Sequence, residues 1–315
     1  MLASVLCCAA GAAQAQGAKT PSASSKTAAP AAVEGVTVDS GPKARVIEKQ
    51  SHAFVQSYAA PTAELDQVAR WDEPVCIQVE GLPAAQTGLV VDRVADVARA
   101  VGLRAQEKGC HANIEIVFTA QPQALMDDVA KRRETLLGYF HRHDRDKLKL
   151  VTHPIQAWYV TATQGGGGSN AAMFYGVNMQ PQRNVVDDPD NPAPTGCGIN
   201  PHFTACLQAQ LKNAFIVADA KALDGKDLRL LSDYLVMLAL SQPRSLDGCN
   251  NLASVIDALS KVSCSSEVPD GLTPGDAAYL TALYSADMEG KKQAQETDIA
   301  LRMAKILTKA AVAAR

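Results

Sequence analysis

The stretch that decides the fold of this chain is residues 227–241, DLRLLSDYLVMLALS. Its hydrophobic residues recur at helical spacing and surround the predicted helix on every side. A helix that is apolar all round is buried, so the other elements must pack around it. We expect Asp224 to cap the start of the helix and Pro243 to end it. The apolar side chains are Leu228, Leu231, Leu235 and Leu238 on one side and Leu230, Tyr234, Met237 and Leu240 around the others.

Two adjacent polar residues, Ser232 and Asp233, interrupt this apolar surround. A buried serine in a helix can donate a hydrogen bond to a carbonyl of the preceding turn. A buried aspartate requires a cation or several N–H donors, because an unpaired charge is costly in a protein core. We therefore expect Ser232 and Asp233 to be structural, buried polar residues with specific partners.

The chain before this helix alternates between predicted strands and helices, which gives a β-α-β-α-β front half. Alternating or continuous apolar residues predict strands over 74–80, 113–119 and 148–163. Apolar residues at helical spacing predict helices over 46–58, 88–101 and 122–137. A helix near 203–212 and a short strand over 214–218 complete this half of the chain.

The chain after residue 241 is predicted to be helical. Thr273-Pro274-Gly275-Asp276 combines an N-cap hydroxyl, a proline in the first turn and an acidic residue, and it predicts a helix over 274–286. Helices over 250–260 and 292–313 flank it. The predicted fold class is therefore α+β, with a βαβ-type mixed sheet in the front half, a helical back half, and disulfides that staple the domain.

The composition excludes several classes of protein. The 315 residues are 47% hydrophobic and 20% charged, which is typical of a globular protein and excludes a wholly disordered one. The 30 basic residues are outnumbered by 33 acidic ones and form no cluster, so no nucleic-acid partner is expected. No stretch reaches the roughly 18 consecutive apolar residues of a transmembrane helix. The sequence does not identify a partner; an envelope component or another protein is the candidate.

The N-terminal region predicts export. Residues 1–15, MLASVLCCAAGAAQA, are apolar and end in Ala13-Gln14-Ala15, which suits a signal-peptidase site. Residues 16–45 are rich in Ala, Ser and Pro and predict a disordered linker. Residues 46–315 then form a single α+β domain, with an α/β part over 46–220 and a helical part over 221–315. The predicted location is the periplasm or the extracellular space.

The cysteines agree with export. Six remain after removal of the signal peptide, and an even number in an exported chain predicts disulfides. Zinc binding is the alternative, but the chain has no C-x-x-C pair and no zinc-finger spacing. Pairing of neighbours in sequence gives Cys76–Cys110, Cys197–Cys206 and Cys249–Cys264.

One cluster of polar residues has metal-ligating character. In His141-Arg142-His143-Asp144-Arg145-Asp146, His141 and His143 would point the same way from an extended segment, with Asp144 or Asp146 as an oxygen ligand. The cluster resembles the H-x-H-x-D-H pattern of metallo-β-lactamase-fold hydrolases, but Arg145 stands where the aspartate belongs. A solvated charged turn is the favoured interpretation, and no cofactor is predicted.

Several stretches resemble a family of exported alphaproteobacterial proteins of unknown function. The resemblance begins with LDQVARWDEPVCIQVEGL at residues 65–82 and HANIEIVF at 111–118. It continues through QPQALMDDV, LLGYF, HPIQAWYVTAT, LSDYLVMLAL and LTPGDAAYLTALY, and it covers most of residues 46–290.

The layout of this family is similar to that of the zinc metallopeptidases called zincins. The resemblance implies that helix 227–241 occupies the place of the H-E-x-x-H helix, in which two histidines bind zinc and a glutamate acts as general base. Ser232 and Asp233 stand there instead, and no two of the six histidines are four residues apart. The resemblance therefore implies a non-catalytic, metallopeptidase-like scaffold with a binding or envelope role. The alternative is a metal-dependent hydrolase that uses His141 and His143.

The disulfide prediction can be tested directly. Peptide mapping of the mature protein without reduction should recover Cys76–Cys110, Cys197–Cys206 and Cys249–Cys264. Closing a loop of about 15 residues stabilises a fold by roughly 3 kcal/mol in the chain-entropy model, so reduction should also lower the melting temperature. Free thiols or metal-bound cysteines in the folded protein would contradict the prediction.

Overall fold

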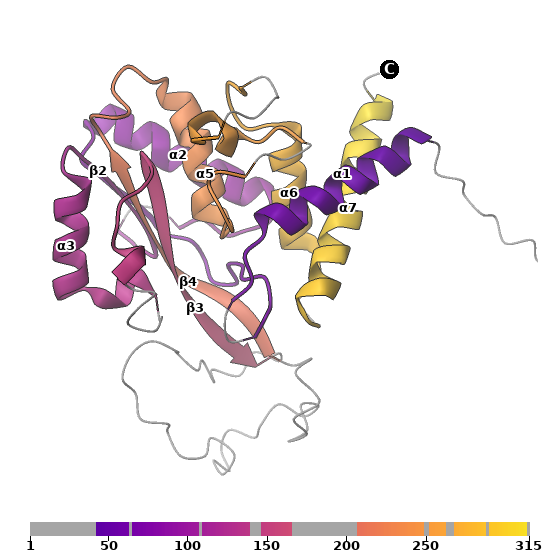
Figure 1. Ribbon diagram of the computed structural model, residues 1–315, viewed down its shortest axis with the longest axis horizontal. Coiled ribbons are helices and arrows are strands. Elements are labelled where there is room, and N and C mark those ends of the chain that lie inside the picture. Colours follow the sequence, from indigo (N-terminus) through magenta and orange to yellow (C-terminus); the bar gives the residue numbers. More distant parts are fainter. Residues whose placement is uncertain are drawn as a thin grey trace, which may run out of the picture. The chain divides into compact units, whose positions relative to one another are not determined.

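A four-stranded mixed sheet forms the front half of the fold (Figure 1). The computed structural model describes residues 42–62, 65–106, 109–138, 146–165, 207–248, 252–262, 268–287 and 290–313. The strands are β1 (Ile77–Glu80), β2 (Ile114–Thr119), β3 (Ile155–Gly165) and β4 (Leu207–Asp219), in the order β1-β2-β4-β3. Strands β1, β2 and β4 are parallel, and β3 pairs with β4 in the antiparallel direction at the edge.

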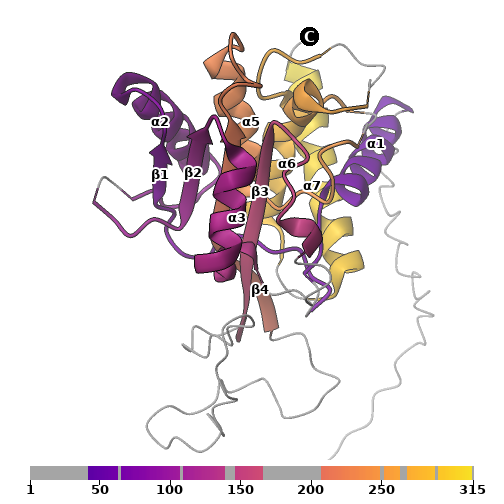
Figure 2. The same cartoon turned by 60° about the vertical axis from the view of Figure 1, so that its left-hand side comes forward.

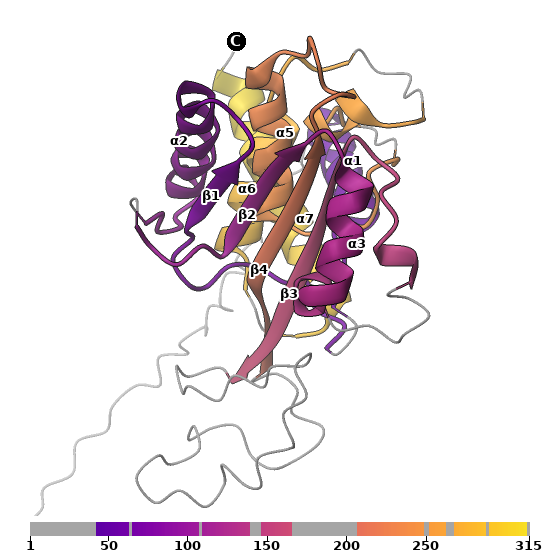
Figure 3. The same cartoon turned by 90° about the vertical axis from the view of Figure 1, so that its left-hand side faces the viewer.

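The helices cover both faces of the sheet. Helix α3 lies on one face, and α2 and α5 lie on the other with the remaining helices behind them (Figures 2 and 3). The helices are α1 (Pro42–Tyr58), α2 (Ala84–Ala100), α3 (Pro122–Arg132), α5 (Leu228–Leu240), α6 (Pro274–Ser285) and α7 (Lys292–Ala313), with 3-10 turns η1 (Glu134–Leu137) and η4 (Val255–Leu259). No helix in these ranges is long and apolar enough to cross a membrane.

Alternation along the strands divides the core between the two faces. Ile114 and Ile116 of β2 pack with α2 and α5 in the larger core. Phe215 and Val217 of β4 face the other way and pack with Trp158 and α3 in the smaller core. Because β4 is covered on both faces, its buried stretch AFIVA is almost continuously apolar. The predicted α+β fold class, with a βαβ front half and a helical back half, is confirmed.

Two predicted helices are wrong. Residues 207–212 of the predicted helix near 203–212 belong to β4, where alternation of Leu207, Ala209 and Leu211 and pairing with β3 outweigh helical propensity. The helix predicted over 250–260 is only η4 among the described residues. Ser254 and Asp257 form a capping box at the start of this 3-10 turn, and Ser254 Oγ also donates to Asp276.

Some predicted boundaries also differ. The predicted linker over 16–45 overlaps α1, which starts at Pro42 because proline fits a first helical turn and Lys43 to Arg45 favour a helix. The N-cap of α5 is Asp227, not Asp224, and its carboxylate accepts a hydrogen bond from the Arg229 N–H at 2.9 Å. The helix predicted over 122–137 divides into α3 and η1 at Arg133, whose backbone dihedrals (φ −135°, ψ 43°) are not helical.

The structure contains the predicted Cys76–Cys110 disulfide, across a separation of 34 residues. It joins the start of β1 to the segment that enters β2. The Cys76 N–H also donates to Asn113 Oδ1 at 2.7 Å, and the Cys76 carbonyl accepts from Ile114 N–H at 3.0 Å. Cys197, Cys206, Cys249 and Cys264 lie outside the described residues, so their pairing stays a prediction.

The end of α5 is buried, and side chains satisfy its last carbonyl groups. The carbonyl of Met237 accepts the Ser241 N–H at 3.1 Å, whereas those of Leu238, Ala239 and Leu240 have no partner within the helix and lie away from water, so each of these three needs another donor. Tyr159 Oη donates to Leu238 O at 2.8 Å, Trp71 Nε1 to Ala239 O at 2.8 Å, Tyr284 Oη to Leu240 O at 2.5 Å and Ser241 Oγ to Met237 O at 2.7 Å. The donors come from β3, the segment before β1, α6 and the cap residue of α5 itself.

A half-buried arginine donates to the carbonyl groups at the end of α6 in the same way. Arg70 Nη1 donates to the carbonyls of Leu283 and Ala286 at 2.5 and 2.7 Å. A cation at a helix C-terminus also interacts favourably with the partial negative charge of the helix dipole. The segment before β1 therefore caps two helices of the back half, through Trp71 and Arg70.

The capping of α5 predicts different results for two buried tyrosines. Tyr284→Phe removes the donor to the Leu240 carbonyl and should destabilise the fold by about 1–3 kcal/mol, because a buried acceptor loses its partner. Tyr279→Phe is the matched control, since the Tyr279 hydroxyl has no hydrogen-bond partner in the part of the chain that the structure describes. Thermal unfolding should show a fall of several degrees for the first variant and no fall for the second. Equal losses would contradict the capping role.

Candidate functional site

The first candidate site is the pair of polar residues on α5. Ser232 is fully buried, and its Oγ donates to the Leu228 carbonyl at 2.7 Å. Asp233 is 8% exposed and accepts two hydrogen bonds, from Arg93 Nε at 2.5 Å on Oδ1 and from Leu272 N–H at 2.8 Å on Oδ2. The serine bonds back to its own helix, and the aspartate has both a cation and an N–H donor.

These contacts make Asp233 a junction between three elements. Arg93 belongs to α2, and Leu272 belongs to the segment that leads into α6. Gly271 fits against the carboxylate because it has no side chain; a Cβ there would lie 2.8 Å from Asp233 Oδ2. Both oxygens of the carboxylate are therefore engaged in holding α2 and the start of α6 against α5.

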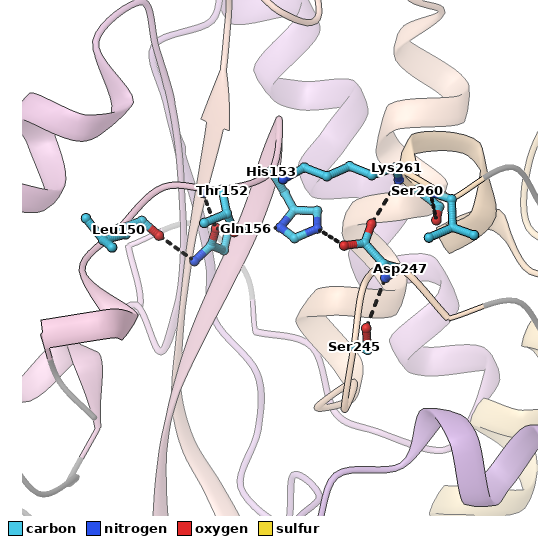
Figure 4. A network of polar contacts seen from close by, with 9 residues as sticks. Leu150, Thr152, His153, Gln156, Ser245, Asp247, Ser260 and Lys261 are labelled. Carbon is cyan, nitrogen blue, oxygen red and sulfur yellow. Dashed lines mark hydrogen bonds and ion pairs between the residues drawn. The ribbon is translucent and has the colours of Figure 1, made fainter. Parts of the chain in front are cut away.

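The second candidate site is a polar network around His153 (Figure 4). His153 Nε2 lies 2.9 Å from Asp247 Oδ2, and His153 Nδ1 lies 2.8 Å from Thr152 Oγ1. Asp247 Oδ1 accepts the Lys261 N–H at 2.8 Å. The His153 side chain is 14% exposed and that of Asp247 is 31% exposed, so the pair is partly shielded from water. We call His153 and Asp247 the His153–Asp247 pair.

The neighbouring amide of Gln156 extends this network. Gln156 Nε2 donates to the Leu150 carbonyl at 3.2 Å and Oε1 accepts the Thr152 N–H at 2.9 Å, which fixes the orientation of the amide. The Thr152 hydroxyl lies 3.1 Å from Gln156 Oε1 and 2.8 Å from His153 Nδ1, and its single proton can serve only one of these two atoms.

The surroundings of Asp247 favour its ionised form. The Lys261 N–H holds the pKa of the Asp247 carboxyl below its usual range, and the hydrogen bond from His153 acts in the same direction, although partial desolvation opposes both. Tyr234 of α5 also faces this carboxylate. Burial, and then the charges of Asp247 and Asp257, raise the pKa of the Tyr234 phenol, so this hydroxyl stays neutral at physiological pH.

The His153–Asp247 pair lies at the edge of the sheet where the parallel strands end. Ile155 at the start of β3 pairs with Ala218 near the end of β4, which places His153 beside the carboxyl ends of the parallel strands. Chains leaving this edge turn to opposite faces, since α2 and α5 cover one face and α3 the other. In open α/β sheets, ligands bind outside the carboxyl ends of strands at such positions.

The network contains a hydroxyl, an imidazole and a carboxylate in series, as hydrolytic triads do. In a triad, however, the hydroxyl proton is directed at the imidazole that will remove it. Here Gln156 Oε1 lies 3.1 Å from the Thr152 hydroxyl and competes with His153 for its proton. The geometry shows a hydrogen-bonded pair that joins two chain segments 94 positions apart.

The residues predicted as metal ligands are placed only in part. His141 and His143 lie outside the described residues, so the structure does not test them. Asp146 is exposed and accepts from Lys149 Nζ at 2.7 Å within the same short turn. Within the described ranges, no group of three or more His, Cys, Asp and Glu side chains could hold a metal ion.

Sequence reasoning missed the His153–Asp247 pair. The two residues are 94 positions apart and belong to no local motif, so only the fold brings them together. Comparison with protein-family models, with curated proteins and with solved structures finds no match to this chain.

The Asp233 junction predicts a specific loss of stability. Asp233→Ala removes the partner of Arg93 and leaves the Leu272 N–H without its acceptor, so we expect a loss of about 1–3 kcal/mol and a melting temperature several degrees lower. Asp96→Ala is the matched control, because Asp96 forms an ion pair with Arg99 on the exposed surface of α2. That exposed pair should contribute at most about 0.5 kcal/mol. Similar losses in both variants would show that Asp233 has no special role.

Proposed function

We propose that this chain is an exported, non-catalytic protein with a metallopeptidase-like scaffold and a role in binding or in the envelope. The observation that carries the proposal is the use of Ser232 and Asp233 in the fold. A peptidase helix must leave its polar side chains free to reach a metal and a water molecule. Here the serine hydroxyl bonds to its own helix, and both carboxylate oxygens of Asp233 have partners.

The third position of the comparable motif supports the same conclusion. If Ser232 takes the place of the first histidine and Asp233 that of the glutamate, the second histidine would fall on Val236. Val236 is fully buried in the larger core, where it has no access to a metal ion. All three positions therefore serve the interior of the protein.

Two observations support the other parts of the proposal. The Cys76–Cys110 disulfide suits an oxidising compartment, as does the predicted signal peptide that ends at Ala15. The carboxyl edge of the sheet, with the His153–Asp247 pair, is the position where a fold of this type would hold a ligand.

Metal analysis and a hydrolysis assay test this proposal. The mature protein, purified from the periplasm, should contain no stoichiometric zinc and should not hydrolyse casein or a peptide library, with or without added zinc. Asp233→Asn is the decisive variant, because it removes the charge and keeps an oxygen acceptor. Hydrolysis that is sensitive to a chelator, and that Asp233→Asn abolishes without a lower melting temperature, would overturn the proposal.

The alternative of a metal-dependent hydrolase rests on the spacing of His141 and His143, which could place both imidazoles on one side of an extended segment. The double variant His141→Ala, His143→Ala separates the two proposals. Under the non-catalytic proposal it has the same metal content as the unmodified protein. Stoichiometric metal that is lost in the double variant would favour the hydrolase.

A further inference from the structure

We propose that the outer face of α1 and α7 docks on a membrane surface that contains anionic phospholipids. The two helices pack against each other on the side of the fold away from α3 (Figure 1). The proposal rests on the envelope role proposed above, because it names the membrane as the partner. We call this surface the α1–α7 face, and its exposed side chains are Val46, Lys49, Leu301, Lys305, Lys309 and Val312.

Positive charge is concentrated on these two helices. With histidine counted as neutral, α1 and α7 each carry a formal net charge of +2, whereas the whole chain carries −3, so the rest of the chain carries −7. In salt solution the charges nearest to a surface dominate the attraction, because more distant ones are screened. An anionic surface therefore attracts this protein through α1 and α7 and repels the remainder of the chain.

The acidic side chains of α7 are used within the fold. Glu296 is buried, and its Oε1 accepts a hydrogen bond from Arg244 Nη2 at 3.3 Å. Asp298 Oδ2 accepts from Arg302 Nε at 2.9 Å and from the Asp287 N–H at 2.9 Å. Both carboxylates are therefore engaged with neighbouring residues and do not offset the basic residues further along the helix.

The second half of α7 is basic and exposed. No acidic residue follows Asp298 in this helix, whereas Lys305 and Lys309 lie one turn apart on its exposed side. Neither lysine forms an ion pair with any of the residues that the structure describes. Residues 309–313 are all exposed although they are helical, so the last turn adds nothing to the core. These ammonium groups are therefore left to bind phosphate groups outside the chain.

Apolar side chains are exposed between the lysines. Val312 is 67% exposed, Val46 55% and Leu301 46%, which makes three of the seven large apolar side chains that are exposed in the described part of the chain. Leu301 and Lys305 are four residues apart and Val312 follows seven later, so they lie on one side of α7. Val46 and Lys49 share a side of α1 in the same way.

This mixture of side chains fits a lipid surface better than an acidic protein. At the membrane interface, lipid phosphates bind the lysines while apolar side chains enter the boundary of the acyl chains. An acidic protein surface would match the lysines only. The first turns of α1 and the last turns of α7 lie at the same end of the pair (Figures 1 and 2), so both helices can meet one flat surface together.

Vesicle binding by the full mature chain tests the proposal. The protein should sediment with vesicles of phosphatidylglycerol and phosphatidylcholine at about 20 mM NaCl, and much less with phosphatidylcholine alone. Binding should fall at about 0.15 M NaCl, where the Debye length shortens to about 8 Å. The double variant Lys305→Gln, Lys309→Gln should bind roughly 30-fold more weakly, because each basic residue near an anionic membrane contributes about a factor of five.

The double variant Lys221→Gln, Lys226→Gln is the matched control. These two lysines are exposed in the turn between β4 and α5, and their replacement changes the net charge by the same amount. This control should bind as the unmodified protein does. Val312→Ser should bind the anionic vesicles several-fold more weakly at the same salt concentration, because it removes apolar area from the interface.

The proposal is overturned if the unmodified protein shows no preference for the anionic vesicles, a result that requires no variant to fold. Equal losses in the two lysine variants at unchanged melting temperature would also overturn it. Binding to soluble polyglutamate without binding to the vesicles would do the same and would indicate an acidic protein as the partner. None of these outcomes alters the zinc and hydrolysis results that test the non-catalytic role, so the two proposals can fail separately.

Discussion

The fold depends on one requirement, which is that the last turn of α5 must find hydrogen-bond donors inside the protein. A buried carbonyl without a partner costs about 1–3 kcal/mol, and three carbonyls of this turn, at Leu238, Ala239 and Leu240, need a donor from outside the helix. Tyr159, Trp71 and Tyr284 each bring one donor from a different part of the chain. The sheet, the segment before β1 and α6 therefore have to meet at this helix end, which fixes their positions around α5.

The interior of the protein also uses the polar side chains of α5. The middle of this helix carries Ser232 and Asp233, and both are used to complete the hydrogen bonding of the interior. Neither of these two side chains is therefore left to hold a ligand. Polar residues with some access to solvent, such as His153 and Asp247, lie instead where the strands end.

Patterns along the sequence predict α5, the alternation of the strands and the Cys76–Cys110 disulfide, because each depends on local spacing or on neighbouring cysteines. The expected burial of Asp233 predicts that this residue needs a cation or several N–H donors. It does not identify Arg93 as the cation. Pairing of Leu207 with β3 and of His153 with Asp247 depends on the tertiary fold. His153 and Asp247 are 94 positions apart and form no local sequence motif, so the candidate site at the sheet edge could not be predicted.

The position of the Cys76–Cys110 disulfide has a consequence for how the chain folds. Parallel strands normally form late, because a long connection must close before they can pair. This disulfide closes the connection between β1 and β2 covalently, directly beside the first register pair, Ile77 and Ile114. Once it has formed, the entropy of closing that loop is no longer an obstacle to pairing. The βαβ unit can then act as an early nucleus on which the later strands assemble.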